Sequence, residues 1–210
     1  MDYRQMKEKN LDYFTDLLNE TDADEHRAVA QSEVSHIKRF EKILELGDFT
    51  DRSILDVGCG IGGFYDFLMK KNIPCDYTGI DINPYMIQIA RTKYPHIKDK
   101  FFICDIIEES LERTFDFVCS NGPLNLKCGK ALNKTMTFTF LHRMYDLATV
   151  GTAMTMTSSF TRKPNKETFY YNPMEILTEI SKFCVNVRFD HTYLPHDFAV
   201  FCYKKDLYDF

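Results

Sequence analysis

Apolar residues recur at helical spacing near the start of the chain. They lie three or four positions apart over Leu11–Leu18 and again over Val29–Leu46. This spacing places apolar side chains on one face of a helix. We therefore expect residues 1–48 to be helical, with Asp22 or Asp24 capping the start of the second helix.

From Ser53 onward, short apolar runs alternate with amphipathic segments. The apolar runs predict strands over residues 53–57, 76–81, 100–104, 115–119 and 153–157. The segments between them predict helices over residues 64–71, 84–90 and 133–148, the second opened by Asn83 as its cap and Pro84 in its first turn. Strands that alternate with helices indicate a mostly parallel sheet that is covered on both faces.

The end of the chain follows a different pattern. A helix is expected over residues 173–183, followed by two strands over residues 185–189 and 198–203. Only about eight residues separate these strands, which is too few for a helical crossover, so they should be antiparallel neighbours. The sixth strand is expected to run parallel to the earlier ones. The predicted fold is α/β: a Rossmann-like, seven-stranded, mostly parallel sheet with an antiparallel last strand, helices on both faces and an N-terminal helical cap.

Length and composition fit one globular domain. The 210 residues are 44% hydrophobic and 27% charged, as expected for a single soluble domain. We assign residues 1–210 to one domain, with residues 1–48 as the helical segment and residues 49–210 as the core. The net charge of −5 argues against a nucleic-acid partner. No run of about 20 apolar residues is present, so no membrane association and a cytoplasmic location are expected.

The seven cysteines show no metal-binding pattern. No two of them form a Cys-x-x-Cys pair, and most lie inside apolar runs. In such runs cysteine behaves as a small hydrophobic residue. The sequence therefore predicts reduced, buried thiols and no metal site.

A glycine-rich turn follows the first predicted strand. Gly58, Gly60 and Gly63 satisfy the spacing G-x-G-x-x-G, which lets a backbone turn tightly and approach a ligand. That spacing alone also fits a dinucleotide site. Asp56 lies two residues before the first glycine. A carboxylate there would be unfavourable beside a pyrophosphate, and it suits a cationic ligand such as one with a sulfonium and an amino group.

Two further acids end the next two predicted strands. Asp81 follows the glycine turn by about 20 residues, where a carboxylate can accept hydrogen bonds from ribose hydroxyls. Asp105 could accept a hydrogen bond from an adenine amino group, with Ile82 and Ile106 against the ring faces. The alternative is that these acids only cap the following helices. Acids at three successive strand ends, Asp56 included, favour a nucleoside ligand.

In these motifs the sequence resembles the class I S-adenosylmethionine-dependent methyltransferases. Asp56–Gly62 resembles the glycine motif of the family, Ile80–Asp81 its ribose-binding acid and Cys104–Ile106 its adenine-side motif. Phe115–Asn121 resembles its fourth-strand motif, and the resemblance covers residues 50–205. It implies S-adenosylmethionine as cofactor and methyl transfer as activity. The cofactor-binding residues that it implies are Asp56, Gly58, Cys59, Gly60, Gly62, Asp81, Ile82, Asp105, Ile106 and Asn121.

One departure from the family limits the chemistry. Methyltransferases that act on exocyclic amino groups of bases or on glutamine often carry Asn/Asp-Pro-Pro-Tyr after the fourth strand. Here the chain has Ser120-Asn121-Gly122-Pro123-Leu124. Amino-group chemistry of that kind is therefore not supported.

Candidate acceptor-side residues follow the ends of later strands. Asn125 follows the fourth strand, Tyr171 the fifth, and His191 and Tyr193 the sixth. We expect all four to contact the substrate, with His191 and Tyr171 as catalytic residues. Of these, His191 would accept a proton from the acceptor. The alternatives are exposed turn positions or packing at the sheet edge. Over the same site, the N-terminal segment is a candidate lid through Tyr13, Phe14 and Gln31.

The sequence thus predicts methyl transfer to a small-molecule metabolite by in-line displacement, in which the protein mainly aligns the reactants. A protein or RNA substrate is the alternative, and a homodimer is left open. An NAD-dependent oxidoreductase would account for the glycines and Asp81, but it fits poorly with Asp56. A non-catalytic S-adenosylmethionine-binding partner subunit would also retain the acids.

Overall fold

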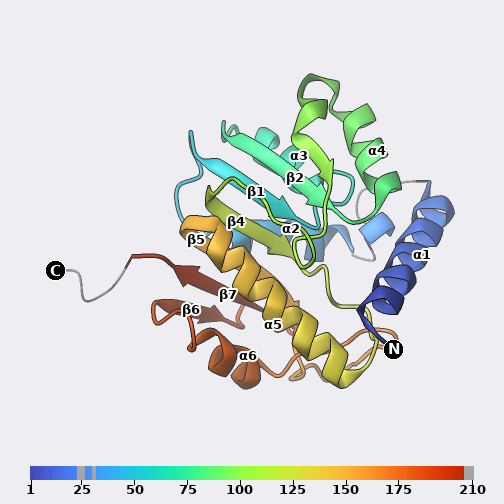
Figure 1. Ribbon diagram of the computed structural model, residues 1–210, viewed down its shortest axis with the longest axis vertical. Helices are drawn as coiled ribbons and strands as arrows, with labels where there is room; N and C mark the ends of the chain where they lie inside the picture. Colours follow the sequence, from blue (N-terminus) through green and yellow to red (C-terminus); the bar gives the residue numbers. More distant parts are fainter. Residues whose placement is uncertain (23–26, 30–31, 206–210) are drawn as a thin grey trace.

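A seven-stranded sheet forms the centre of the protein (Figure 1), in a computed structural model that describes residues 1–22, 27–29 and 32–205. The strand order is β3-β2-β1-β4-β5-β7-β6. The strands are β1 (Ser53–Val57), β2 (Asp76–Asp81), β3 (Phe101–Ile103), β4 (Phe115–Asn121), β5 (Ala148–Thr157), β6 (Val187–Asp190) and β7 (Asp197–Tyr203).

Strand directions confirm the predicted sheet. The pairs β1–β2, β1–β4, β2–β3 and β4–β5 are parallel. Strand β7 is antiparallel to both of its neighbours, β5 and β6, so β6 runs parallel to β5. Figure 1 shows the arrowhead of β7 pointing away from α1, while those of β1 and β2 point toward it. The carboxyl ends of the parallel strands therefore face α1.

Helices cover both faces of the sheet. They are α1 (Tyr3–Thr21), α2 (Glu33–Leu44), α3 (Gly63–Lys70), α4 (Pro84–Lys93), α5 (Lys130–Leu147) and α6 (Pro173–Ile180), with 3-10 segments η1 (Arg27–Val29) and η2 (Pro95–Lys100). Side chains of α2, α3 and α4 share one apolar cluster with the sheet, and those of α5 and α6 share another. Figure 1 accordingly shows α5 in front of the sheet and α3 behind it.

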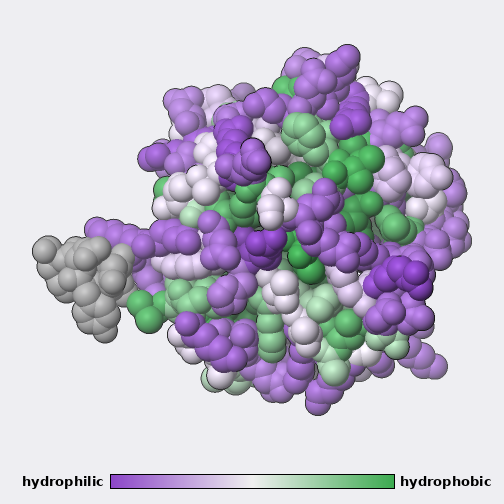
Figure 2. All heavy atoms as spheres, viewed as in Figure 1, coloured by the Kyte–Doolittle hydropathy of each residue, from purple (hydrophilic) through white to green (hydrophobic). Residues whose placement is uncertain are grey.

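The central strands are buried on both sides. Ile54 and Leu55 of β1 point to opposite faces and are both 0% exposed. Burial of each such side chain contributes about 1.5–3 kcal/mol. Edge strand β3 instead exposes Phe102 and Ile103. Figure 2 shows that hydrophilic residues dominate the viewed face, with apolar patches between them.

Several boundaries differ from the sequence predictions. Helix α2 is capped by Ser32, whose hydroxyl accepts a hydrogen bond from the Ser35 amide at 3.3 Å. Asp22 instead ends α1 in a left-handed conformation, φ 52°, while Asp24 and Gln31 lie outside the described residues. Strand β5 begins at Ala148, five residues before the predicted start at residue 153, because Ala148 already pairs with Phe115 of β4.

The predicted cap of α4 is confirmed. Asn83 caps α4, since its side-chain oxygen accepts the amide of Tyr85 at 2.9 Å. The seven cysteines are free thiols, five of them buried: Cys59, Cys104, Cys119, Cys184 and Cys202. None of the helices in the described part of the chain combines the length and apolar character needed to cross a bilayer.

Candidate functional site

A pocket lies at the carboxyl ends of β1, β2 and β4, beside α1. This is the edge where ligands bind in parallel α/β sheets. Most of the predicted cofactor residues line it: Asp56, Gly58, Cys59, Gly60, Asp81, Ile82, Asp105, Ile106 and Asn121.

The glycine turn needs its glycines for conformation and for space. Gly58 and Gly60 have φ angles of 75° and 55°, in the left-handed region that favours glycine. A Cβ atom on Gly58 would lie 2.8 Å from Cβ of Pro123. Gly62 does not line the pocket. It begins α3 with φ 85°, and a Cβ there would lie 2.7 Å from the Tyr94 ring, so its position serves local packing.

Asp56 is a buried carboxyl group at the end of β1. The Tyr77 hydroxyl donates a hydrogen bond to its Oδ2 at 2.7 Å. Burial raises the pKa of Asp56 to about 7, the Tyr77 hydrogen bond opposes this rise, and the nearby Asp81 adds to it. A cation in the pocket would favour the ionised form of Asp56.

Asp81 is held by backbone groups on both sides. Its Oδ2 accepts the Gly60 amide at 2.9 Å and its Oδ1 accepts the Asn83 amide at 2.8 Å. Burial raises the pKa of Asp81, and these amides counteract the rise. Each oxygen keeps a second lone pair. The carboxylate can therefore accept two more hydrogen bonds, as a ribose diol would supply.

Asp105 makes contacts that were not predicted from the sequence. The Tyr3 hydroxyl donates to both of its carboxylate oxygens at 2.9 Å, and Lys7 Nζ lies 3.0 Å from Oδ2. Both donors come from α1, which also contributes Met6, Asn10 and Phe14 to the pocket lining. Phe14 was an expected lid residue, whereas Tyr13 does not line the pocket.

Helix α2 adds a second group that the sequence analysis missed. His36 is buried and lines the pocket together with Phe40, and their ring centroids are 4.3 Å apart. The only signal in the sequence is its place beside Ile37 in the apolar pattern of this helix. His36 is thus a titratable group within the pocket.

The predicted catalytic residues lie outside the pocket lining. Tyr171 is buried in the core, donates to the Leu124 carbonyl at 2.7 Å and accepts from the Thr137 hydroxyl at 2.8 Å. Burial raises the pKa of Tyr171. His191 Nε2 lies 2.6 Å from the Ser158 hydroxyl. Both side chains are therefore engaged with other parts of the protein.

The remaining acceptor-side candidates also have internal contacts. Asn125 accepts a hydrogen bond from the Thr157 hydroxyl at 3.0 Å, and the Tyr193 ring lies 5.5 Å from Lys42 Nζ. Neither lines the pocket. Asn121 does line it, while its Oδ1 accepts from Thr155 at 2.9 Å. The structure therefore gathers the cofactor candidates and leaves Asn125, Tyr171, His191 and Tyr193 outside.

Comparisons with known proteins bear on the domain and on the fold. A methyltransferase-domain family model matches residues 54–149. A malonyl-[acyl-carrier protein] O-methyltransferase of Acetivibrio thermocellus is 31% identical, over 53% of this chain and 47% of that protein. The magnesium protoporphyrin IX methyltransferase of Synechocystis PCC 6803, solved with bound SAH, has a TM-score of 0.66 at 14% identity and covers 95% of this chain and 99% of that one.

The fold is Rossmann-like, and the pocket gathers the acids and glycines predicted for a nucleoside ligand. The chain is thus similar to methyltransferases over residues 54–149, and it shares its fold with solved methyltransferases that carry bound SAH. It spans 43% and 47% of the lengths of the first two curated relatives that it matches.

Proposed function

We propose that the protein transfers a methyl group to a small-molecule acceptor. The observation that carries this proposal is that one pocket brings together the glycine turn, Asp56, Asp81 and Asp105. Asp81 would hold the ribose and Asp105 the adenine amino group. Asp56 would face the positively charged end of the cofactor, beside the backbone of the turn.

The residues present fit this cofactor. Ile82 and Ile106 offer apolar surfaces for the adenine, and the free lone pairs of Asp81 suit the ribose hydroxyls. A buried carboxyl group such as Asp56 gains most when a positive charge binds beside it. When bound, S-adenosylmethionine supplies a methyl group that its sulfonium already activates.

The contribution of the chain is then alignment and exclusion of water. Pro123 and Leu124 follow β4 in the pocket wall, and Phe40 and Phe64 form an aromatic pair in it, with ring centroids 5.2 Å apart. These apolar groups would orient the acceptor and keep water out. His36 could accept a proton from an acceptor that must lose one. His191 and Tyr171, the catalytic residues predicted from sequence, would have to reach the acceptor from outside the pocket lining.

The proposed acceptor is a metabolite or a small acyl group. The net charge of −5 disfavours RNA, and the pocket walls are largely apolar. The Acetivibrio relative is named for methyl transfer to malonyl-acyl carrier protein. We therefore include carboxylate-bearing acyl groups among the acceptors to test.

The decisive experiment is calorimetry with S-adenosylmethionine, S-adenosylhomocysteine and NADH, followed by assays of S-adenosylhomocysteine production over a panel of acceptors. Binding of the sulfur ligands together with turnover supports the proposal. Binding of NADH alone would indicate an oxidoreductase. Tight binding of the sulfur ligands without turnover on any acceptor would indicate a non-catalytic partner subunit.

A further inference from the structure

Helix α1 is attached to the pocket through the carboxylate of Asp105. The Tyr3 hydroxyl lies 2.9 Å from both carboxylate oxygens, and Lys7 Nζ lies 3.0 Å from Oδ2. Lys7 also forms an ion pair with Glu108. Burial and the neighbouring carboxylate of Asp105 raise the pKa of Tyr3, so its hydroxyl keeps the proton that it donates.

These contacts occupy the outward edge of the Asp105 carboxylate. A carboxylate offers about four lone-pair sites. The single hydroxyl proton of Tyr3 is shared, because its oxygen lies 2.9 Å from both Oδ1 and Oδ2 and so lies across the edge between them. Oδ1 also accepts from the Ile107 amide at 2.9 Å, and Oδ2 from Lys7. An adenine amino group can therefore reach the outward edge of Asp105 only if Tyr3 moves away from it.

The same helix spans the pocket. Met6, Asn10 and Phe14 line it, and Thr15 accepts a hydrogen bond from the Asn83 side chain at 3.2 Å. Near its other end, Leu18 shares an apolar cluster with residues of α4 and the glycine turn. Release of the Asp105 contacts would thus free the N-terminal part of α1 while its C-terminal part stays packed.

We propose that Tyr3 and Lys7 form a latch that competes with the adenine amino group for Asp105. Entry of the cofactor exchanges these contacts for the adenine and loosens the first turns of α1. The latch rests on the proposed function, because it takes Asp105 as the adenine-binding acid. It couples occupancy of the cofactor site to the position of the helix that covers it.

The first test is calorimetry of Tyr3→Phe combined with Lys7→Met. The probes are S-adenosylhomocysteine and its 6-deamino analogue, in which hydrogen replaces the adenine amino group. The double variant should bind S-adenosylhomocysteine about fivefold or more tightly than the wild type, since a charge-assisted competitor is gone. Its affinity for the analogue should change by less than about twofold, because the analogue has no amino group with which to reach Asp105.

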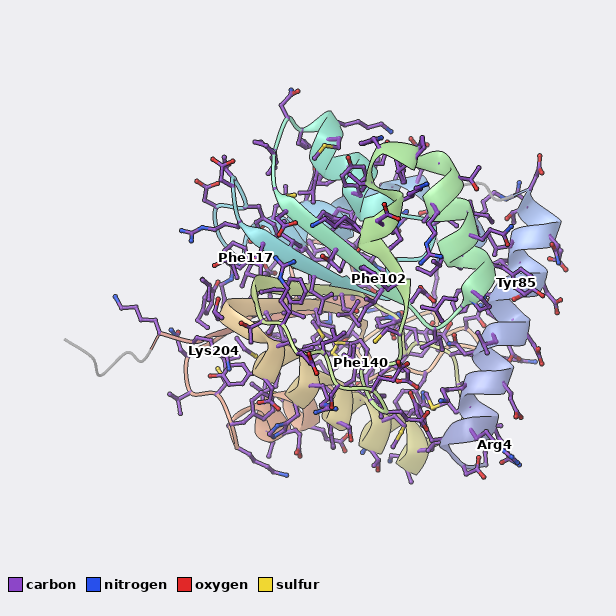
Figure 3. The ribbon with its side chains drawn as sticks, turned by 45° about the horizontal axis from the view of Figure 1, so that its top comes forward. Arg4, Tyr85, Phe102, Phe117, Phe140 and Lys204 are labelled. Carbon is purple, nitrogen blue, oxygen red and sulfur yellow. The ribbon has the colours of Figure 1, made fainter. Side chains whose placement is uncertain are left out.

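Two matched substitutions on the same helix show whether loss of a hydroxyl group or of a charge anywhere on α1 alters affinity. Tyr13→Phe removes the same atom from a residue outside the pocket lining. Arg4→Met removes a charge from a side chain that is 78% exposed and lies at the N-terminal end of α1 (Figure 3). Neither should alter the affinity for either probe. Weaker or unchanged binding of S-adenosylhomocysteine by the double variant would overturn the latch.

Hydrogen exchange gives a second, independent readout. Saturating S-adenosylhomocysteine should speed amide exchange in the first turns of α1 of the wild type. In the double variant, exchange there should already be fast without ligand. Protection of these amides by the ligand in the wild type contradicts the latch but leaves the proposed function intact. Failure of the wild type to bind S-adenosylhomocysteine contradicts the proposed function itself.

Discussion

Polar side chains at one edge of the sheet differ between its two halves: in one half they line the pocket, and in the other they bond to other parts of the protein. At the ends of β1 and β2, Asp56 and Asp81 line the pocket and keep capacity for a ligand. At the same edge of the other half, Asp197 begins β7 and forms a fully buried ion pair with Arg39. His191 is likewise engaged by Ser158 at 2.6 Å.

The reversed strand explains this difference. A parallel strand leaves this edge of the sheet through a turn into a helix, so space remains beyond its end. Strand β7 instead enters the sheet at this edge, where Asp197 pairs with Thr157 at the end of β5. Its first residues and the preceding turn occupy the space that a ligand would need. One half of the edge is therefore built for ligand binding and the other for stability.

The largest expected effect follows from removal of the buried ion pair in the stabilising half. Arg39→Met leaves the Asp197 carboxylate buried without its cation, which should lower the free energy of unfolding by about 3–5 kcal/mol. Urea denaturation measures this loss. Replacing both residues, with Arg39→Met and Asp197→Leu, should recover most of it. A loss below about 1 kcal/mol in the single variant would show that the pair contributes little.

The next effect concerns the ligand-binding half. Asp81→Ala should weaken S-adenosylhomocysteine binding by more than about tenfold, because the ribose loses its charged acceptor. The matched control is Asp190→Ala, at the end of β6, which should leave that affinity unchanged. Calorimetry compares the two variants. Equal losses of affinity in both variants would contradict the distinction between the ligand-binding and stabilising halves of the sheet edge.

A pH titration sharpens the same comparison at Asp56. Its pKa is raised to about 7, so the pocket carries a neutral carboxyl group below that pH. Affinity for S-adenosylhomocysteine, which has a positively charged amino group, should rise by up to about tenfold per pH unit toward pH 7 and then level off. Asp56→Asn should flatten this profile.

Stability should show the opposite dependence on pH. The unfolded chain ionises Asp56 near its ordinary pKa, whereas the folded chain without ligand keeps it protonated up to about pH 7. The unfolded state therefore binds fewer protons between about pH 4 and 7, and stability falls as the pH rises through that range. Asp56→Asn should remove this component of the decrease, which chemical denaturation at pH 5 and pH 8 would measure.

The smallest expected effect is at His191. His191→Gln should cost about 1 kcal/mol of stability through the bond to Ser158 and leave cofactor affinity unchanged. Turnover of the same variant tests the sequence-based prediction that His191 accepts a proton. A fall in turnover at constant cofactor affinity supports that role, and a parallel loss of both indicates a packing defect.

The sequence alone was enough to locate those parts of the candidate site that depend on residues adjacent along the chain. The strand ends at Asp56, Asp81 and Asp105 could be located because a buried run, an acid and a turn follow one another directly. The antiparallel direction of the last strand could be predicted because the connection to the strand before it is too short for a helical crossover. Both inferences need only neighbouring residues.

Features that depend on tertiary packing could not be predicted in this way. Tyr3 and His36 reach the pocket only through tertiary packing, which neither helix specifies by itself. Helix α1 lies beside the strand ends, and α2 packs on one face of the sheet with His36 near its first turn. Tyr171 follows the end of β5 as expected, but its hydroxyl bonds inward to Leu124 and Thr137. A strand-end position alone does not decide whether a side chain faces a ligand or the core.

The close approach of Gly58 and Pro123 has a consequence for redesign of the proposed activity. With only 2.8 Å between a Cβ at position 58 and Cβ of Pro123, the cofactor turn and the loop after β4 form one steric unit. A loop grafted from a relative to change the acceptor would fit only if its second residue, at the position of Pro123, left the same room. Modular exchange of acceptor specificity in this protein would therefore have to carry both segments together.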